Sequence, residues 1–185
     1  MNLPLWLTAF RLVLIPFVVA LLFVPLPLCN VIAAVLFAVA LATDWLDGWL
    51  ARRWNQTSAF GAFLDPVADK LIVCSVLVML VYRDPHWYVS LCATIIVGRE
   101  LTVSALREWM AELGERGVVA VDKLGKYKTA IQMSAIVIML AKLSEQGWIY
   151  ALGVLLLAAA SVLTLWSMTL YLRAAWPRLS MARDE

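Results

Sequence analysis

Apolar residues fall along this chain in six long runs, separated by short polar or proline-bearing stretches. The runs cover about 10–24, 30–50, 66–81, 87–109, 126–143 and 148–172. Each run has the length of a helix, and about 18 or more apolar residues can cross a bilayer as a helix. Because open strands would leave backbone groups unpaired in lipid, the pattern predicts six transmembrane helices.

The first residues differ from the runs that follow. Residues 2–7 predict a short interfacial helix with Trp6 at the level of the lipid headgroups. The start lacks the basic region and small-residue cleavage site of a secretory signal, so we expect it to remain in the mature protein. The predicted fold class is an all-α membrane protein, with residues 1–185 forming a single domain of six transmembrane helices plus this short helix.

Composition and charge support the membrane assignment and orient the chain. Hydrophobic residues make up 64% of it and charged residues 15%, whereas soluble domains carry about 45–50% and about 25%. With six spans, both termini and the loops at 52–64 and 112–125 share one side. That side holds most of the basic residues, and the opposite loops hold only Arg83 and Lys142. The positive-inside rule therefore predicts that both termini face the cytoplasm.

Acidic residues gather at one predicted helix junction. Asp44 and Asp47 lie near the end of the second run, and Asp65 and Asp69 lie at the start of the third. At about 100° per residue, each pair shares one helix face. The face of the first pair, an arc of roughly 140°, also holds Gly48, Ala51 and Arg52. If a short loop folds the two helices side by side, the four carboxylates converge.

Such a cluster needs neutralisation, because ionised carboxylates at membrane depth are costly and repel one another. Oxygen ligands without Cys or His indicate hard cations, Mg²⁺ or Mn²⁺, and four carboxylates suit two of them. The small residues Gly48 and Ala51 leave room for a substrate, and Arg52 offers a phosphate partner. A single Asp-x-x-Asp pair is usually a solvated helix cap; two pairs flanking one tight turn favour a site.

The spacing of these residues resembles a family signature. The pattern Asp44-x2-Asp47-Gly48-x2-Ala51-Arg52-x8-Gly61-x3-Asp65-x3-Asp69 matches the CDP-alcohol phosphotransferase motif at every fixed position. Within that family, further segments resemble the proteobacterial phosphatidylglycerophosphate synthases. These segments are 2–4 with Thr8 and Arg11, 51–56, 99–113 and 125–129. The resemblance covers essentially the whole chain.

The resemblance implies a reaction and a set of roles. CDP-diacylglycerol and sn-glycerol 3-phosphate would give phosphatidylglycerophosphate and CMP, in phospholipid biosynthesis at the bacterial inner membrane. Asp44, Asp47 and Asp65 are implied to bind metal, and Asp69 to bind metal and act as general base. The residues implied to bind CDP-diacylglycerol are Thr8, Gly48, Ala51, Arg52, Ser58 and Gly61. A homodimer, with its site facing the cytoplasm, is implied as well.

An acceptor that carries phosphate needs its own cations. Arg99 and Arg107 lie within about 80° of each other on the fourth predicted helix, and Lys126 and Lys128 begin the fifth. We interpret all four as ligands of glycerol 3-phosphate. A salt bridge of Arg99 to Glu100 or Glu108 is the alternative for the arginines, and binding of anionic lipid is the alternative for the lysines.

Two other functions remain open at this stage. A sister enzyme that transfers to another alcohol would carry the same signature, and only the predicted acceptor residues argue against it. A cation or proton transporter would also use carboxylates within the membrane. Transporters usually place them near the midplane on broken helices, however, whereas these lie at the cytoplasmic ends of the predicted spans.

Overall fold

Six α-helices make up the part of the chain that the structure, a computed structural model, describes. It describes residues 3–54, 59–112, 123–145 and 147–181. Within the helices, side chains are not described at 3–5, 7, 45, 47–54, 59–60, 62, 112, 123–126 and 174–181. The helices are α1 (Leu3–Phe23), α2 (Pro27–Trp54), α3 (Ala59–Arg83), α4 (Trp87–Glu112), α5 (Lys123–Lys142) and α6 (Trp148–Met181). The predicted all-α class is confirmed, since no strand occurs within these ranges.

Each predicted apolar run falls on one helix to within one residue, and α2 and α3 extend beyond their runs at both ends. Among the residues that the structure describes, three helical stretches are long and apolar enough to cross a membrane: Pro27–Asp44, Trp87–Ala111 and Trp148–Arg173; Thr8–Phe23 is a shorter apolar stretch. These lengths accord with a membrane protein, while six crossings stay a prediction. The separate interfacial helix is not confirmed, because α1 continues without a break from Leu3.

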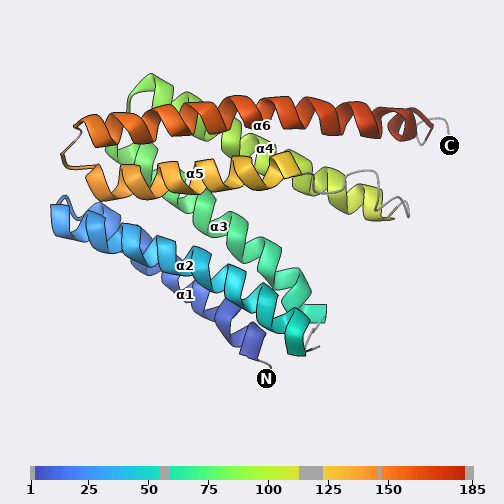
Figure 1. The fold of residues 1–185 in the computed structure, drawn as a ribbon, viewed down its shortest axis with the longest axis horizontal. Coiled ribbons are helices and arrows are strands. Elements are labelled where there is room, and N and C mark those ends of the chain that lie inside the picture. The colour runs from blue at the N-terminus through green and yellow to red at the C-terminus, as the bar shows by residue number, and fades with distance from the viewer. Residues whose placement is uncertain (1–2, 55–58, 113–122, 146, 182–185) are drawn as a thin grey trace.

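The helices alternate in direction, which gives the bundle two distinct ends (Figure 1). The short connections at 24–26, 84–86 and 143–147 lie at one end, which we call the turn end. The start of α1 and the finish of α6 lie toward the other, which we call the terminal end. Residues near the start of α1, α3 and α5 therefore share an end with residues near the finish of α2, α4 and α6.

Helix α1 lies against both α2 and α3 and brings them together. Its buried side chains, at the spacing of one helix face, are Thr8, Arg11, Leu14, Val18 and Leu22. Among the described residues, α2 and α3 touch each other at few points, α3 packs mainly on α1, and α2 packs on both α1 and α5. The side chains on either side of the connection between α2 and α3 lie outside the described residues, so the predicted side-by-side packing of these two helices stays a prediction.

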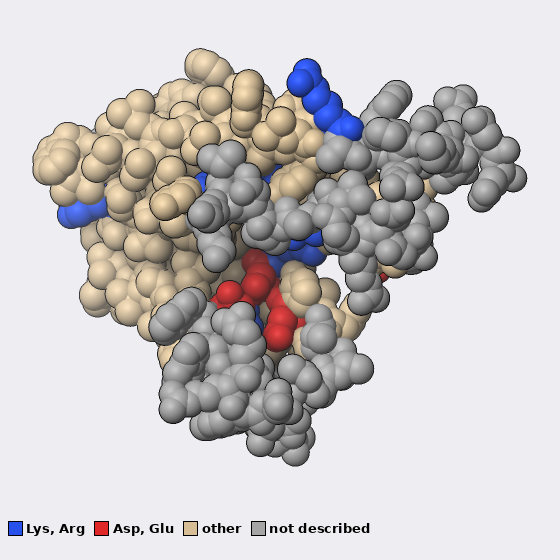
Figure 2. All heavy atoms as spheres, turned by 45° about the vertical axis from the view of Figure 1, so that its right-hand side comes forward, with Lys and Arg blue, Asp and Glu red and all other residues tan. Residues whose placement is uncertain are grey.

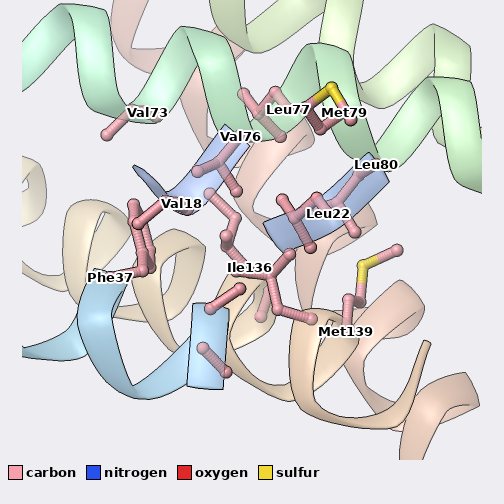
Figure 3. Packing of buried hydrophobic residues seen from close by; sticks show 14 of the residues in the cluster. Val18, Leu22, Phe37, Val73, Val76, Leu77, Met79, Leu80, Ile136 and Met139 are labelled. Carbon is pink, nitrogen blue, oxygen red and sulfur yellow. The ribbon is translucent and has the colours of Figure 1, made fainter. Parts of the chain in front are cut away.

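The apolar core lies toward the turn end and takes buried side chains from all six helices; Figure 3 shows the part formed by α1, α2, α3 and α5. Leu22, Phe37, Leu77 and Ile136 are fully buried there. In lipid, such contacts stabilise by close packing rather than by removal from water. Gly153 permits the close approach of α6 to α5, because a Cβ atom there would lie only 2.8 Å from the side chain of Met139.

Polar side chains fasten the turn end. Asp84 is buried and accepts hydrogen bonds from the hydroxyl of Tyr150, on α6, and from the ring of His86. Arg83 donates to the backbone oxygen of Leu22 at 2.6 Å. Asn30 Nδ2 donates to Ser144 Oγ at 2.6 Å, which links α2 to the connection after α5. These hydrogen bonds link the residues in and beside the three connections to one another.

Candidate active site

A buried arginine on α1 stands at the centre of the acidic cluster. The side chain of Arg11 is 1% exposed, and its Nη1 donates to Asp44 Oδ1 at 2.8 Å and also to Asp69 Oδ1. Its Nη2 lies 3.6 Å from Asp65 Oδ1. The structure thus brings Asp44 of α2 and both aspartates of α3 together around a single guanidinium group.

Burial in this cluster is unequal. The cation is enclosed, whereas the side chains of Asp44, Asp65 and Asp69 are 44%, 41% and 44% exposed. One guanidinium balances only one of three carboxylates, so the cluster keeps a surplus of negative charge. An arrangement of this kind attracts a further cation at its open face.

Thr8 sits one turn before Arg11 on the same buried stripe. Its side chain is 1% exposed, and its hydroxyl donates to Asp65 Oδ1. This contact fixes the orientation of a carboxylate near the start of α3. Gly61 lies one turn before Asp65 on α3 and is half-buried.

A cavity of about 1180 Å³ extends from the acidic cluster into the space between α3, α4 and α5. Asp44, Asp69 and Arg11 line one part of it, and Arg99 and Lys128 line another. In Figure 2, acidic side chains lie in a hollow of the surface with basic side chains beside them. The cavity therefore joins a region of surplus negative charge to a region of positive charge.

Three of the predicted acceptor cations line this cavity. Arg99 on α4 is 7% exposed and pairs with Glu100 at 3.0 Å, so the salt bridge considered as the alternative for Arg99 is present at the cavity wall. Arg107, two turns later, is exposed. Lys128 on α5 is 3% exposed, and its Nζ has no hydrogen-bond partner among the residues that the structure describes. A buried ammonium without a partner is costly, which favours an anion at this position.

Lys70 and Ser104 bridge the cavity between its two charged regions. Lys70 directly follows Asp69 on α3, and its Nζ donates to Ser104 Oγ on α4. Both side chains line the cavity. The bond holds α3 and α4 at a fixed separation where the two parts of the cavity meet.

Several predicted site residues lie outside what the structure describes. The side chains of five of them fall there within helices: Asp47, Gly48, Ala51, Arg52 and Lys126. Ser58 lies in the connection between α2 and α3, outside the described residues. Their positions in the site stay predictions.

The donor set fits a hard divalent cation by its chemistry. Asp44 and Asp69 direct carboxylate oxygens at the same nitrogen of Arg11, and neither Cys nor His is among their described neighbours in the cluster. The described side chains contain no group of three or more His, Cys, Asp or Glu that could hold a metal ion. Arg11 occupies the centre instead, and Asp47 would have to complete a ligand set.

Sequence reasoning missed three residues that the structure brings to this cavity: Arg11, Lys70 and Tyr171. Arg11 was named only in a segment that carries the resemblance, and no role in the site was predicted for it. A cation within an apolar run was itself a signal, the same one that identified Arg99. Tyr171 lies near the end of an apolar run, where an aromatic residue is ordinary. Nothing in the sequence singles it out.

Comparison with known proteins gives a family and close relatives. The model of the CDP-alcohol phosphatidyltransferase family matches residues 1–166. Three relatives, all named CDP-diacylglycerol–glycerol-3-phosphate 3-phosphatidyltransferase, align over nearly the whole chain. The protein of Salmonella choleraesuis (strain SC-B67) is 48% identical over 174 residues, and that of Shigella flexneri serotype 5b (strain 8401) is 49% identical over 174, each covering 94% of both chains. The protein of Yersinia enterocolitica is 48% identical over 179 residues, 97% of both chains.

Proposed function

This chain belongs to the CDP-alcohol phosphatidyltransferase family, and we propose that it transfers the phosphatidyl group of CDP-diacylglycerol to sn-glycerol 3-phosphate. The products are phosphatidylglycerophosphate and CMP. One observation of the structure carries this assignment beyond the family. A single cavity has Asp44 and Asp69 in one part, and in another part three cations that outnumber the two carboxylates beside them, as suits a reaction between a diphosphate and a phosphorylated alcohol. The three cations are Arg99, Arg107 and Lys128, and the two carboxylates are Glu100 and Glu108.

The donor site is proposed at the acidic cluster. Asp44, Asp47, Asp65 and Asp69 would hold two divalent cations, Mg²⁺ or Mn²⁺. When bound, these cations supply the charge that offsets the diphosphate and its departing oxygen. The residues proposed to bind CDP-diacylglycerol are Thr8, Gly48, Ala51, Arg52, Ser58 and Gly61. In addition, Thr8 orients Asp65 through its hydroxyl.

Asp69 is proposed as the general base. It lines the cavity that also holds the acceptor cations, and Arg11 fixes its Oδ1. Asp69 takes the proton from the hydroxyl of the acceptor as that oxygen bonds to the β-phosphorus of the donor. The bond from the β-phosphorus to the bridging oxygen breaks, and CMP leaves with the electron pair.

The acceptor site is proposed at the opposite part of the cavity. Arg99, Arg107 and Lys128 would bind the phosphate of glycerol 3-phosphate, and Lys126 is assigned to the same group by its place at the start of α5. Lys128 supports this assignment most strongly, since its buried ammonium lacks a described hydrogen-bond partner. Charge-assisted hydrogen bonds from arginine to phosphate are short and directional.

The protein is proposed to work within the inner membrane of a bacterium as a homodimer. All six helices would cross the membrane, and the site and both termini would face the cytoplasm. The positive-inside rule supports this orientation, and the family resemblance supports the dimer. Both substrates could then reach the cavity, the lipid donor from the bilayer and the acceptor from water.

The decisive assay uses purified protein, labelled glycerol 3-phosphate and vesicles containing CDP-diacylglycerol. We expect a labelled lipid product only when the donor and Mg²⁺ or Mn²⁺ are present together. Full turnover in excess EDTA would remove the metals from the proposal. Transfer to inositol phosphate or serine instead of glycerol 3-phosphate would identify a sister enzyme of the same family.

A further inference from the structure

Tyr171, near the end of α6, lies against two arginines of α4. The guanidinium carbons of Arg99 and Arg107 are 5.8 Å and 5.9 Å from the centre of its ring. Both distances fall within the range of a cation–π interaction. The ring also packs with Leu106 and Met110 of α4 and lines the cavity. Apolar contacts therefore fix the ring while it attracts two cations.

Helix α4 alone does not bring these two guanidinium groups together. Arg99 and Arg107 are eight residues apart, which separates their backbones by about 12 Å along the helix. Long, flexible side chains at that separation have many conformations that point elsewhere. A ring supplied by another helix gives both of them one common point of contact, at the wall of the cavity.

The kind of contact matters for binding an anion. A carboxylate partner, such as Glu100 beside Arg99, offsets the positive charge and occupies N–H donors. An aromatic ring has no net charge and leaves the N–H groups at the edge of the guanidinium plane available for a bidentate bond to phosphate. It also counters the repulsion that Lys128, at the same cavity, exerts on the two arginines.

We propose that Tyr171 is a positioning residue for the acceptor, since its ring holds Arg99 and Arg107 at the spacing that receives the phosphate of glycerol 3-phosphate. This inference rests on the proposed function. It assigns to α6 a part in acceptor recognition, which the family signature on α2 and α3 does not contain. The ring, rather than the hydroxyl group, performs this role.

The test compares Tyr171→Leu with Tyr171→Phe in the full-length enzyme. We expect Tyr171→Leu to raise KM for glycerol 3-phosphate about fivefold, the effect of losing about 1 kcal/mol of cation–π attraction. The kcat at saturating acceptor and KM for CDP-diacylglycerol should stay within about twofold. Tyr171→Phe keeps the ring and should restore the wild-type constants. Glycerol 3-phosphate alone, without donor, should protect the Leu variant from thermal unfolding only at correspondingly higher concentration.

Two further variants guard the interpretation. Trp166→Leu removes an exposed aromatic side chain from the same helix, outside the cavity lining, and should leave every constant unchanged. Tyr171→Met repeats the test if the Leu variant is not obtained folded. An unchanged KM in the Leu or Met variant overturns the inference, and so does an equal rise in the Phe variant, which would assign the effect to the hydroxyl. If the wild-type enzyme itself does not use glycerol 3-phosphate, that result contradicts the proposed function, and not only the role of Tyr171.

Discussion

The turn end and the terminal end of the bundle both contain charged side chains, but they differ in which charge is buried. At the turn end, the carboxylate of Asp84 is buried, 1% exposed, and its partners are a tyrosine hydroxyl and a histidine ring. At the terminal end the cation is buried instead, since Arg11 is enclosed while Asp44 and Asp69 are nearly half-exposed. One end is closed around its anion, and the other presents its anions to a cavity.

This difference separates a structural contact from a binding site. A buried carboxylate with hydrogen-bond donors around it has no need of a ligand, and it stabilises the connections that supply the donors. Carboxylates around one buried cation keep surplus charge and open faces, which a cation or a substrate can use. Burial and the number of partners, rather than residue type, therefore distinguish the two ends.

The largest expected effect is at Asp69. If it accepts the proton of the acceptor, Asp69→Asn should lower kcat by about 10³-fold, within the usual contribution of a general base. Turnover is measured at saturating Mn²⁺ or Mg²⁺, because Asp69 is also a proposed ligand. The control is Glu145→Gln, the same chemical change at the turn end, where Glu145 pairs with Lys142 on the surface. Near-normal turnover in Asp69→Asn would exclude it as the base.

The next effect concerns the cationic part of the cavity. Arg99→Ala or Arg107→Ala should raise KM for glycerol 3-phosphate about tenfold or more, since a hydrogen bond to a charged group contributes about 1.5–3 kcal/mol. KM for CDP-diacylglycerol should change much less, and Lys replacements should recover only part of the loss. Arg173→Ala, an exposed arginine outside the cavity lining, is the control. If CDP-diacylglycerol use suffers instead, these arginines belong to the donor site.

A third prediction concerns the hydrogen bond between Tyr150 and Asp84 at the turn end. Tyr150→Phe removes the hydroxyl that donates to buried Asp84 and should lower the free energy of unfolding by about 1–2 kcal/mol. We expect a lower Tm in detergent and a normal kcat below the transition. Tyr82→Phe, at an exposed tyrosine on α3, should change neither quantity. A large loss of kcat in folded Tyr150→Phe would contradict a purely structural role for this end.

The smallest expected effect is a dependence of the Tm on pH that arises from Asp84. Burial raises the pKa of Asp84, but hydrogen bonds from His86 and Tyr150 outweigh it, so the pKa lies below its ordinary value. A lowered carboxylate pKa stabilises the fold above the ordinary value, about 3.9, and this stabilisation is lost as pH falls through the folded pKa. The Tm of the wild-type protein should therefore fall toward that of Asp84→Asn below about pH 4. Parallel Tm curves would contradict the assignment.

The sequence alone determined the helices and most of the chemistry. Apolar runs of helical length predict where each helix lies, because a chain in lipid must pair its backbone groups within the segment. The spacing of Asp44, Asp65 and Asp69 predicts which aspartates share a helix face, since helical periodicity is local. Their meeting follows from the structure, and the position of Asp47 in the cluster stays a prediction.

Only the tertiary structure decided which faces meet. Helix α1 lies against both α2 and α3, so Arg11 enters the acidic cluster, and α6 brings Tyr171 to the arginines of α4. Neither contact has a periodic signal, because each joins residues far apart in the chain through packing of whole helices. In sequence, Arg11 is a charge within an apolar run and Asp84 is a charge just after one, and neither position tells how the charge is enclosed. Whether such a charge is closed off or open to a cavity depends on the neighbours that packing supplies.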